Sequence, residues 1–129
     1  MIQIRDWMSK PVITITKERS VLDAAKKMDE NALGSLPVMK GNDLQGIITE
    51  RDVVRKVVSK GIDPNEKLVG EVMTTSVKTV DIDANFMEVA KIMDEHKFRR
   101  VIITENAKVV GIITSGDLIK LVGGQNQKT

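Results

Sequence analysis

The residues best suited to chemistry in this chain occur twice, in the pattern Gly-Ile-Ile-Thr-x-x-Asp at residues 46–52 and 111–117. In each copy the isoleucines finish an apolar run, and the threonine stands where a helix is expected to begin. A helix N-terminus and a threonine hydroxyl both present hydrogen-bond donors, which suit a phosphate group. An aspartate one turn into the helix can accept both hydroxyls of a ribose. The pattern is therefore a candidate nucleotide site.

The same spacing also describes a purely structural device. Thr49 with Asp52, and Thr114 with Asp117, would form helix capping boxes, in which each side chain accepts the backbone N–H of the other residue. Spacing alone favours this cap over a ligand site, and one residue can hold both roles. The glycine that opens each pattern allows another backbone or a ligand to approach closely.

Both patterns belong to an internal duplication. Displaced by 65 residues, the sequence matches itself without a gap, so that residues 25–30 fall on residues 90–95 and Thr49 falls on Thr114. Such a match over roughly 50 residues indicates a tandem repeat. We expect three segments, namely a first repeat with its N-terminal segment at 1–61, a linker turn and second repeat at 62–123, and a disordered tail at 124–129.

Each repeat is expected to contain a strand, a helix, a β-hairpin and a closing helix. The strand would cover residues 12–15 or 77–80, and the first helix would be capped by Ser20 or Asn85. Apolar residues within 53–58 have helical spacing, which favours the closing helix over another strand. The fold class is therefore mixed α/β (α+β). Units this small cannot each bury a core alone, so we expect two β-α-β-β-α repeats packed about a pseudo-twofold axis, with two clefts between them.

Composition argues against several classes of function. The net charge is +2, from 20 basic and 18 acidic residues, and aromatic residues make up 2% of the chain, so nucleic-acid binding is not expected. The absence of cysteine excludes disulfides, thiolate zinc sites and cysteine nucleophiles. With His96 as the single histidine, neither a metal site nor enzymatic activity is expected. No apolar run approaches the roughly 18 residues of a membrane helix, and the chain does not begin like a signal peptide, so we expect a cytoplasmic protein.

Three motifs together resemble a known family. They are Met8-x-x-x-Val12-x-Thr14, Leu33-Gly34-Ser35-Leu36-Pro37-Val38 and Gly46-Ile47-Ile48-Thr49-x-x-Asp52, and each has a partner in the second repeat. Their order, spacing and doubling are similar to tandem cystathionine-beta-synthase (CBS) domains over nearly the whole chain. The resemblance implies a regulatory module, with no required cofactor, whose clefts bind AMP, ADP, ATP or S-adenosylmethionine.

The resemblance also implies the residues of each cleft. A threonine and an aspartate from one repeat would meet adenine-lining residues of the other, with Asp52 and Asp117 holding ribose hydroxyls and Thr49 and Thr114 touching phosphate. The first cleft would comprise Thr49, Arg51, Asp52, Val77, Lys78, Phe98, Arg99 and Arg100. The second would comprise Val12, Ile13, Leu33, Gly34, Ser35, Pro37, Thr114, Gly116 and Asp117.

In this grouping all three of its arginines belong to the first cleft. The planar guanidinium of arginine can donate two parallel hydrogen bonds to a phosphate. The phosphorylated ligand is therefore expected at Asp52, with the Asp117 cleft binding weakly or staying empty. The resemblance further implies a homodimer formed through the helices, and an unidentified regulated protein as partner. Two other hypotheses remain: a protein-interaction or nucleic-acid-binding scaffold with vestigial clefts, and, less favoured, an enzyme acting on nucleotides.

Overall fold

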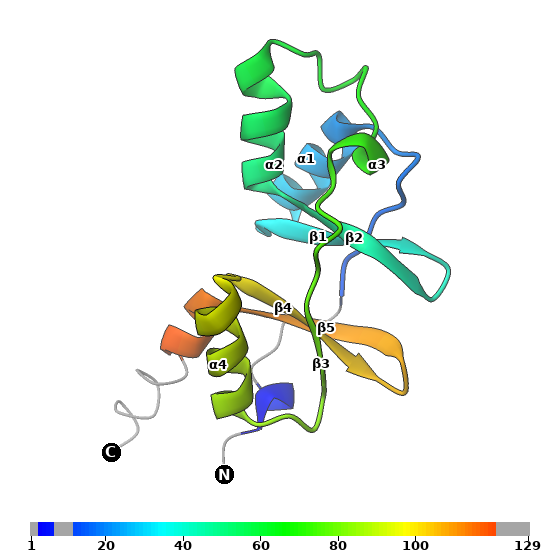
Figure 1. Ribbon diagram of the computed structural model, residues 1–129. Coiled ribbons are helices and arrows are strands. Elements are labelled where there is room, and N and C mark those ends of the chain that lie inside the picture. Colours follow the sequence, from blue (N-terminus) through cyan, green and yellow to red (C-terminus); the bar gives the residue numbers. More distant parts are fainter. Residues whose placement is uncertain (1–2, 7–11, 121–129) are drawn as a thin grey trace. The chain divides into compact units, whose positions relative to one another are not determined.

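The structure, a computed structural model, describes residues 3–6 and 12–120 (Figure 1). The expected tail at 124–129 lies outside the described residues. Contacts divide the chain into two compact units. We call residues 13–77 the first unit, and residues 3–6, 12 and 78–120 the second unit. The boundaries and the pseudo-twofold packing expected for the repeats remain predictions.

The first unit is built on a two-stranded antiparallel hairpin that helices cover on one face (Figure 1). Its elements are α1 (Val21–Glu30), β1 (Ser35–Lys40), β2 (Asp43–Thr49), α2 (Glu50–Lys56), a 3-10 turn (Val58–Lys60) and α3 (Val69–Val72). Its core joins Val21 and Met28 of α1 to Leu36, Ile48 and Val57. The helical spacing predicted for residues 53–58 is confirmed, because α2 covers residues 53–56 and the 3-10 turn begins at Val58.

The second unit contains a three-stranded sheet of order β3-β4-β5. Its elements are a 3-10 turn (Ile4–Asp6), β3 (Thr79–Asp81), α4 (Phe86–His96), β4 (Arg100–Glu105) and β5 (Lys108–Thr114), and residues 115–120 are helical. Ile4 is fully buried in this core beside Ile82 and Val89. The N-terminal segment of the first repeat therefore packs with elements of the second repeat.

The strand expected at residues 12–15 is wrong in extent. Only Ile15 pairs with β1, through a parallel bridge to Val38 in which Ile15 N donates to Pro37 O at 3.0 Å. The next bond of a parallel ladder would need an N–H at Pro37, which proline lacks. In the second unit Ile102 stands at the equivalent position, and its N–H donates to Lys78 O at 3.0 Å. This bond lets the parallel pairing of β3 and β4 begin.

The N-cap residues predicted from the sequence are confirmed at the starts of α1 and α4. Ser20 Oγ accepts from Asp23 N at 3.0 Å, and Asn85 Oδ1 accepts from Glu88 N at 2.9 Å. A mixed α+β fold is likewise confirmed, with the core of each unit formed between its strands and its helices. Among the described residues, no helix is both long and apolar enough to cross a membrane.

Candidate functional site

Both Thr-x-x-Asp patterns form helix capping boxes. Thr49 N donates to Asp52 Oδ2 at 3.0 Å, and Asp52 N donates to Thr49 Oγ1 at 3.1 Å. In the second unit Thr114 N donates to Asp117 Oδ2 at 2.8 Å, and Asp117 N donates to Thr114 Oγ1 at 3.1 Å. The capping interpretation of the sequence is therefore confirmed at both places. A ligand-binding role would have to be held by residues that also begin a helix.

The Asp52 carboxylate makes further bonds inside the first unit. It is 6% exposed, and Lys56 Nζ lies 3.0 Å from its Oδ1. The Thr74 hydroxyl lies 3.1 Å from Oδ1, and the Thr49 hydroxyl donates to Oδ2 at 3.1 Å. Together with Thr49 N–H, these donors take up the roughly four lone-pair directions of a carboxylate. Asp52 is thus satisfied without a ligand.

The Asp117 carboxylate differs from that of Asp52 in burial and hydrogen bonding. It is half-buried, and within the described residues its side chain accepts the one hydrogen bond from Thr114 N. By sequence, the position equivalent to Lys56 is Leu121, which has no charge to offer, although its structure lies outside the described residues. The two boxes therefore differ in what surrounds the aspartate, although their own geometry is nearly the same.

Arg99 and Arg100, at the start of β4, lie beside the second box. Arg100 is directly opposite Thr114 in the register of β4 and β5, so both side chains leave the same face of the sheet. Arg99 O accepts a hydrogen bond from Ser115 N at 2.8 Å. The antiparallel hairpin brings the two arginines there, because the start of its first strand lies beside the end of its second. Their expected membership of the Asp52 cleft would be a contact between the repeats, and it stays a prediction.

The equivalent residues of the first repeat lie beside the first box. Ser35 is opposite Thr49 in the β1–β2 register, and Gly34 O accepts from Glu50 N at 3.0 Å. These two residues were expected in the Asp117 cleft. The structure therefore joins Gly34 and Ser35 to Thr49, and Arg99 and Arg100 to Thr114, each within one unit.

The remaining expected site residues are divided between the units. Ile13, Leu33, Pro37, Arg51 and Val77 belong to the first unit, and Val12, Lys78, Phe98 and Gly116 belong to the second. The ring of Phe98 stacks on His96, with ring centroids 5.7 Å apart. Arg51 and Gly116 are exposed, each in the first turn of its helix. Whether these residues contact a ligand stays a prediction.

Two residues near Asp52 were missed from the sequence. Lys56 stands four residues after Asp52, a spacing that places both on one helix face and could have been read as an ion pair. Thr74 carried no such signal, because 22 residues separate it from Asp52 and only the folded chain brings them together.

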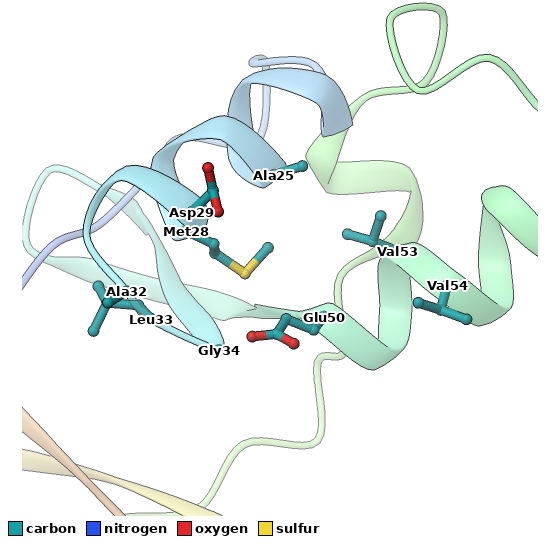
Figure 2. A pocket seen from close by; sticks show the side chains of 9 residues that line it. All are labelled: Ala25, Met28, Asp29, Ala32, Leu33, Gly34, Glu50, Val53 and Val54. Atoms are coloured by element: carbon teal, nitrogen blue, oxygen red, sulfur yellow. The ribbon is translucent and has the colours of Figure 1, made fainter.

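A groove of about 530 Å³ lies between α1 and α2 of the first unit. Figure 2 shows Met28 reaching from α1 toward Val53 on α2, with the carboxylates of Asp29 and Glu50 nearby. Val54 lines the same groove and is 57% exposed. The groove is thus an apolar surface bordered by acidic side chains. The described residues contain no cluster of three or more acidic, histidine or cysteine side chains that could hold a metal ion.

Comparison with known proteins identifies the class to which this fold and these paired boxes belong. The family model described as CBS domain matches residues 4–59 and again residues 69–124. The chain therefore belongs to the CBS domain family and carries two copies of the domain. The expectation of a CBS pair is confirmed, and CBS-pair proteins are ligand-binding regulatory modules.

Individual relatives support the same assignment. The chain is 35% identical over 121 residues to hypoxic response protein 1 of Mycobacterium tuberculosis, covering 93% of this chain and 85% of that one. An uncharacterized conserved protein from Pyrococcus horikoshii has a similar structure, with a TM-score of 0.83, 30% identity and coverage of 93% and 91% of the two chains. The CBS domain pair of protein MJ0100, solved in complex with 5′-methylthioadenosine and S-adenosylmethionine, gives a TM-score of 0.86 at 32% identity and covers 97% and 98%.

Proposed function

We propose that this chain is a sensor of adenine compounds, which binds AMP, ADP, ATP or S-adenosylmethionine through its Thr-x-x-Asp boxes and signals to a separate regulated protein. The bound adenosine moieties of the MJ0100 domain pair support this ligand class, because that pair is 32% identical to this chain. We assign to it the role of a cytoplasmic nucleotide sensor that responds to the energy state of the cell.

The observation that carries the proposal is the surroundings of Asp117. Its carboxylate is half-buried and, among the described residues, is engaged by Thr114 N, so acceptor sites remain for the two hydroxyls of a ribose. Arg100 stands across the hairpin from Thr114, and a planar guanidinium suits a phosphate. The charge argument made from the sequence for the Asp52 cleft is here made for Asp117. We propose the Asp117 box as the site of higher affinity.

No catalytic step is part of this proposal. His96, the single histidine, is exposed and stacked on Phe98. Binding would act by favouring one conformation of the module, and it can do so only by the difference in affinity between the two conformations. The adenine-lining residues named from the sequence remain part of the proposal.

Removing the charge of Asp117 is expected to weaken binding strongly. Titration calorimetry on nucleotide-stripped protein with AMP, ADP, ATP and S-adenosylmethionine should identify the ligand. Asp117→Asn should then lower its affinity about 10- to 100-fold, because hydrogen bonds to a charged acceptor contribute about 1.5–3 kcal/mol.

The matched control is Asp94→Asn, which changes an acidic residue of α4 that is 86% exposed in the same unit and should leave the affinity unchanged. If the wild-type protein gave neither binding heat nor a thermal shift with any of the four compounds, the proposal that it binds adenine compounds would be wrong. The two boxes would then be helix caps only, and an interaction scaffold would be the better account.

We also propose that the protein is a homodimer formed through its helices. Val54 and its equivalent in the second repeat, Ile119, are 57% and 72% exposed, so the same helix position presents an aliphatic side chain in both repeats. Sedimentation velocity at micromolar concentration should show a dimer. Val54→Asp should shift it toward monomer, whereas Lys40→Asp at the exposed end of β1 should not. A wild-type monomer would contradict this part of the proposal.

A further inference from the structure

Asp52 connects its helix to the segment by which the chain leaves the first unit. Thr74 Oγ1 lies 3.1 Å from Asp52 Oδ1, and Lys56 Nζ, which pairs with the same oxygen, also donates to Val72 O at 2.9 Å. The division between the units falls after Val77, so residues 73–77 are one of the two places where the chain passes from one unit to the other. The carboxylate and the crossing segment are thus directly bonded.

The backbone strengthens this connection. Ile47 N donates to Thr74 O at 2.9 Å, and Thr74 N donates to Ile47 O at 2.8 Å, so Thr74 forms an antiparallel bridge to β2. The bridge ends three residues before the crossing. Whatever holds or frees Thr74 therefore determines how firmly the start of the crossing segment is attached to the first unit.

A ribose diol has two hydroxyl donors and needs two free acceptor sites on the aspartate. At Asp52 those sites are already taken by Thr49, Thr74 and Lys56. Thr49 cannot leave without breaking the helix cap. The donors that can be exchanged are the Thr74 hydroxyl, which makes one hydrogen bond to the charged carboxylate, and the half-exposed Lys56, which water can solvate.

We propose that Thr74 and Lys56 are positioning residues that compete with the ribose for Asp52, so that occupation of this box releases residues 73–77. This inference rests on the proposed function and adds a regulation to it. The Asp117 box binds first, and the Asp52 box is a gated site of lower affinity. Its filling is coupled to the freedom of the connection between the two units. The equivalent of Lys56 is Leu121 in the sequence, so the lysine competitor is present in one repeat only.

The test uses the full chain with Asp117→Asn, which leaves the Asp52 box as the remaining site. In this background Thr74→Val should raise the affinity for AMP about 10-fold, the equivalent of one hydrogen bond to a charged acceptor at about 1.5 kcal/mol. The affinity for 2′,3′-dideoxy-AMP should not change, because that compound has no diol to compete. Thr74→Ser should restore the original affinity, and Thr75→Val, at the exposed neighbouring threonine, should have no effect.

Hydrogen exchange gives a second measurement. AMP should speed amide exchange at Ile47 and Thr74 in the Asp117→Asn protein, and Thr74→Val should do so without ligand. The inference is overturned if Thr74→Val weakens AMP binding or changes both compounds equally, or if AMP slows exchange at Thr74. It is also overturned if the Asp117→Asn protein binds no AMP with or without Thr74→Val. Failure of wild-type protein to bind any of the four compounds is a separate result, which removes the proposed function itself.

Discussion

Replacing Gly46 with alanine is expected to lower the free energy of unfolding by about 3 kcal/mol. A Cβ built at Gly46 would lie 2.6 Å from Thr74 O and 3.1 Å from Met73 Sδ. The first of these contacts is with a backbone atom, which cannot be moved away by a change of rotamer as a side-chain atom can. Relief would require Thr74 to leave β2, and both hydrogen bonds between Ile47 and Thr74 would be lost. Overpacking costs about 1–3 kcal/mol, and each lost bond adds about 1 kcal/mol.

Urea unfolding monitored by far-ultraviolet circular dichroism would measure this loss. Gly116→Ala is the matched control, because Gly116 lies in the first turn of a helix and its added Cβ would meet Thr114 Oγ1 at an ordinary 3.5 Å. Alanine there should be neutral or stabilising by up to about 1 kcal/mol, because glycine is the poorer helix former. If the two variants unfolded at the same urea concentration, the close approach of Thr74 to Gly46 would not exist in solution.

Asp52→Ala is the second change with a large expected effect, again about 3 kcal/mol. It removes the acceptor of the helix cap, which contributes about 1 kcal/mol. It also leaves the Thr49 and Thr74 hydroxyls without their acceptor, at about 1–2 kcal/mol for partly buried donors. Lys56 adds little, because its side chain is 44% exposed and can be solvated by water.

The comparison with Asp117→Ala makes this prediction specific. Asp117 forms the same box, but among the described residues it accepts from Thr114 N alone, so its loss should cost about 1 kcal/mol as a helix cap. Equilibrium unfolding of both variants under the same conditions would show the difference of about 2 kcal/mol expected from these contributions. Equal destabilisation would mean that Thr74 and Lys56 do not engage Asp52 in solution.

Much of the local structure could be predicted from the sequence. The helix starts at Ser20, Asn85, Thr49 and Thr114 depend on side chains that bond to backbone three residues away, and such contacts are visible as spacing. The two hairpins were likewise indicated by apolar runs on either side of short polar turns. The exception was residues 12–15, where the absence of an N–H at Pro37 limited the pairing to Ile15.

The composition of the candidate site was less predictable. The sequence grouping did not include the neighbourhood of Arg100 and Thr114, which are opposite each other in the hairpin register. The different hydrogen bonding of the two aspartates could not be predicted either, because Thr74 and Asp52 are 22 residues apart in the sequence. Both features have one physical origin. A motif shows which residue types recur, but strand register and long-range packing decide which of them become neighbours.

By itself, the amino-acid sequence determined that this chain is a tandem repeat, where its helices begin, and that it belongs among the CBS domain pairs, because each of these depends on residue types at short or repeated spacing. Only the tertiary structure decided that the two boxes are unequal. Asp52 is buried and bonded to Thr74 and Lys56, whereas Asp117 is half-buried and, within the part of the chain that the structure describes, accepts from Thr114 N alone. The physical reason is that a carboxylate removed from water must find hydrogen-bond donors, and the folded chain supplies them unequally at its two copies of one motif.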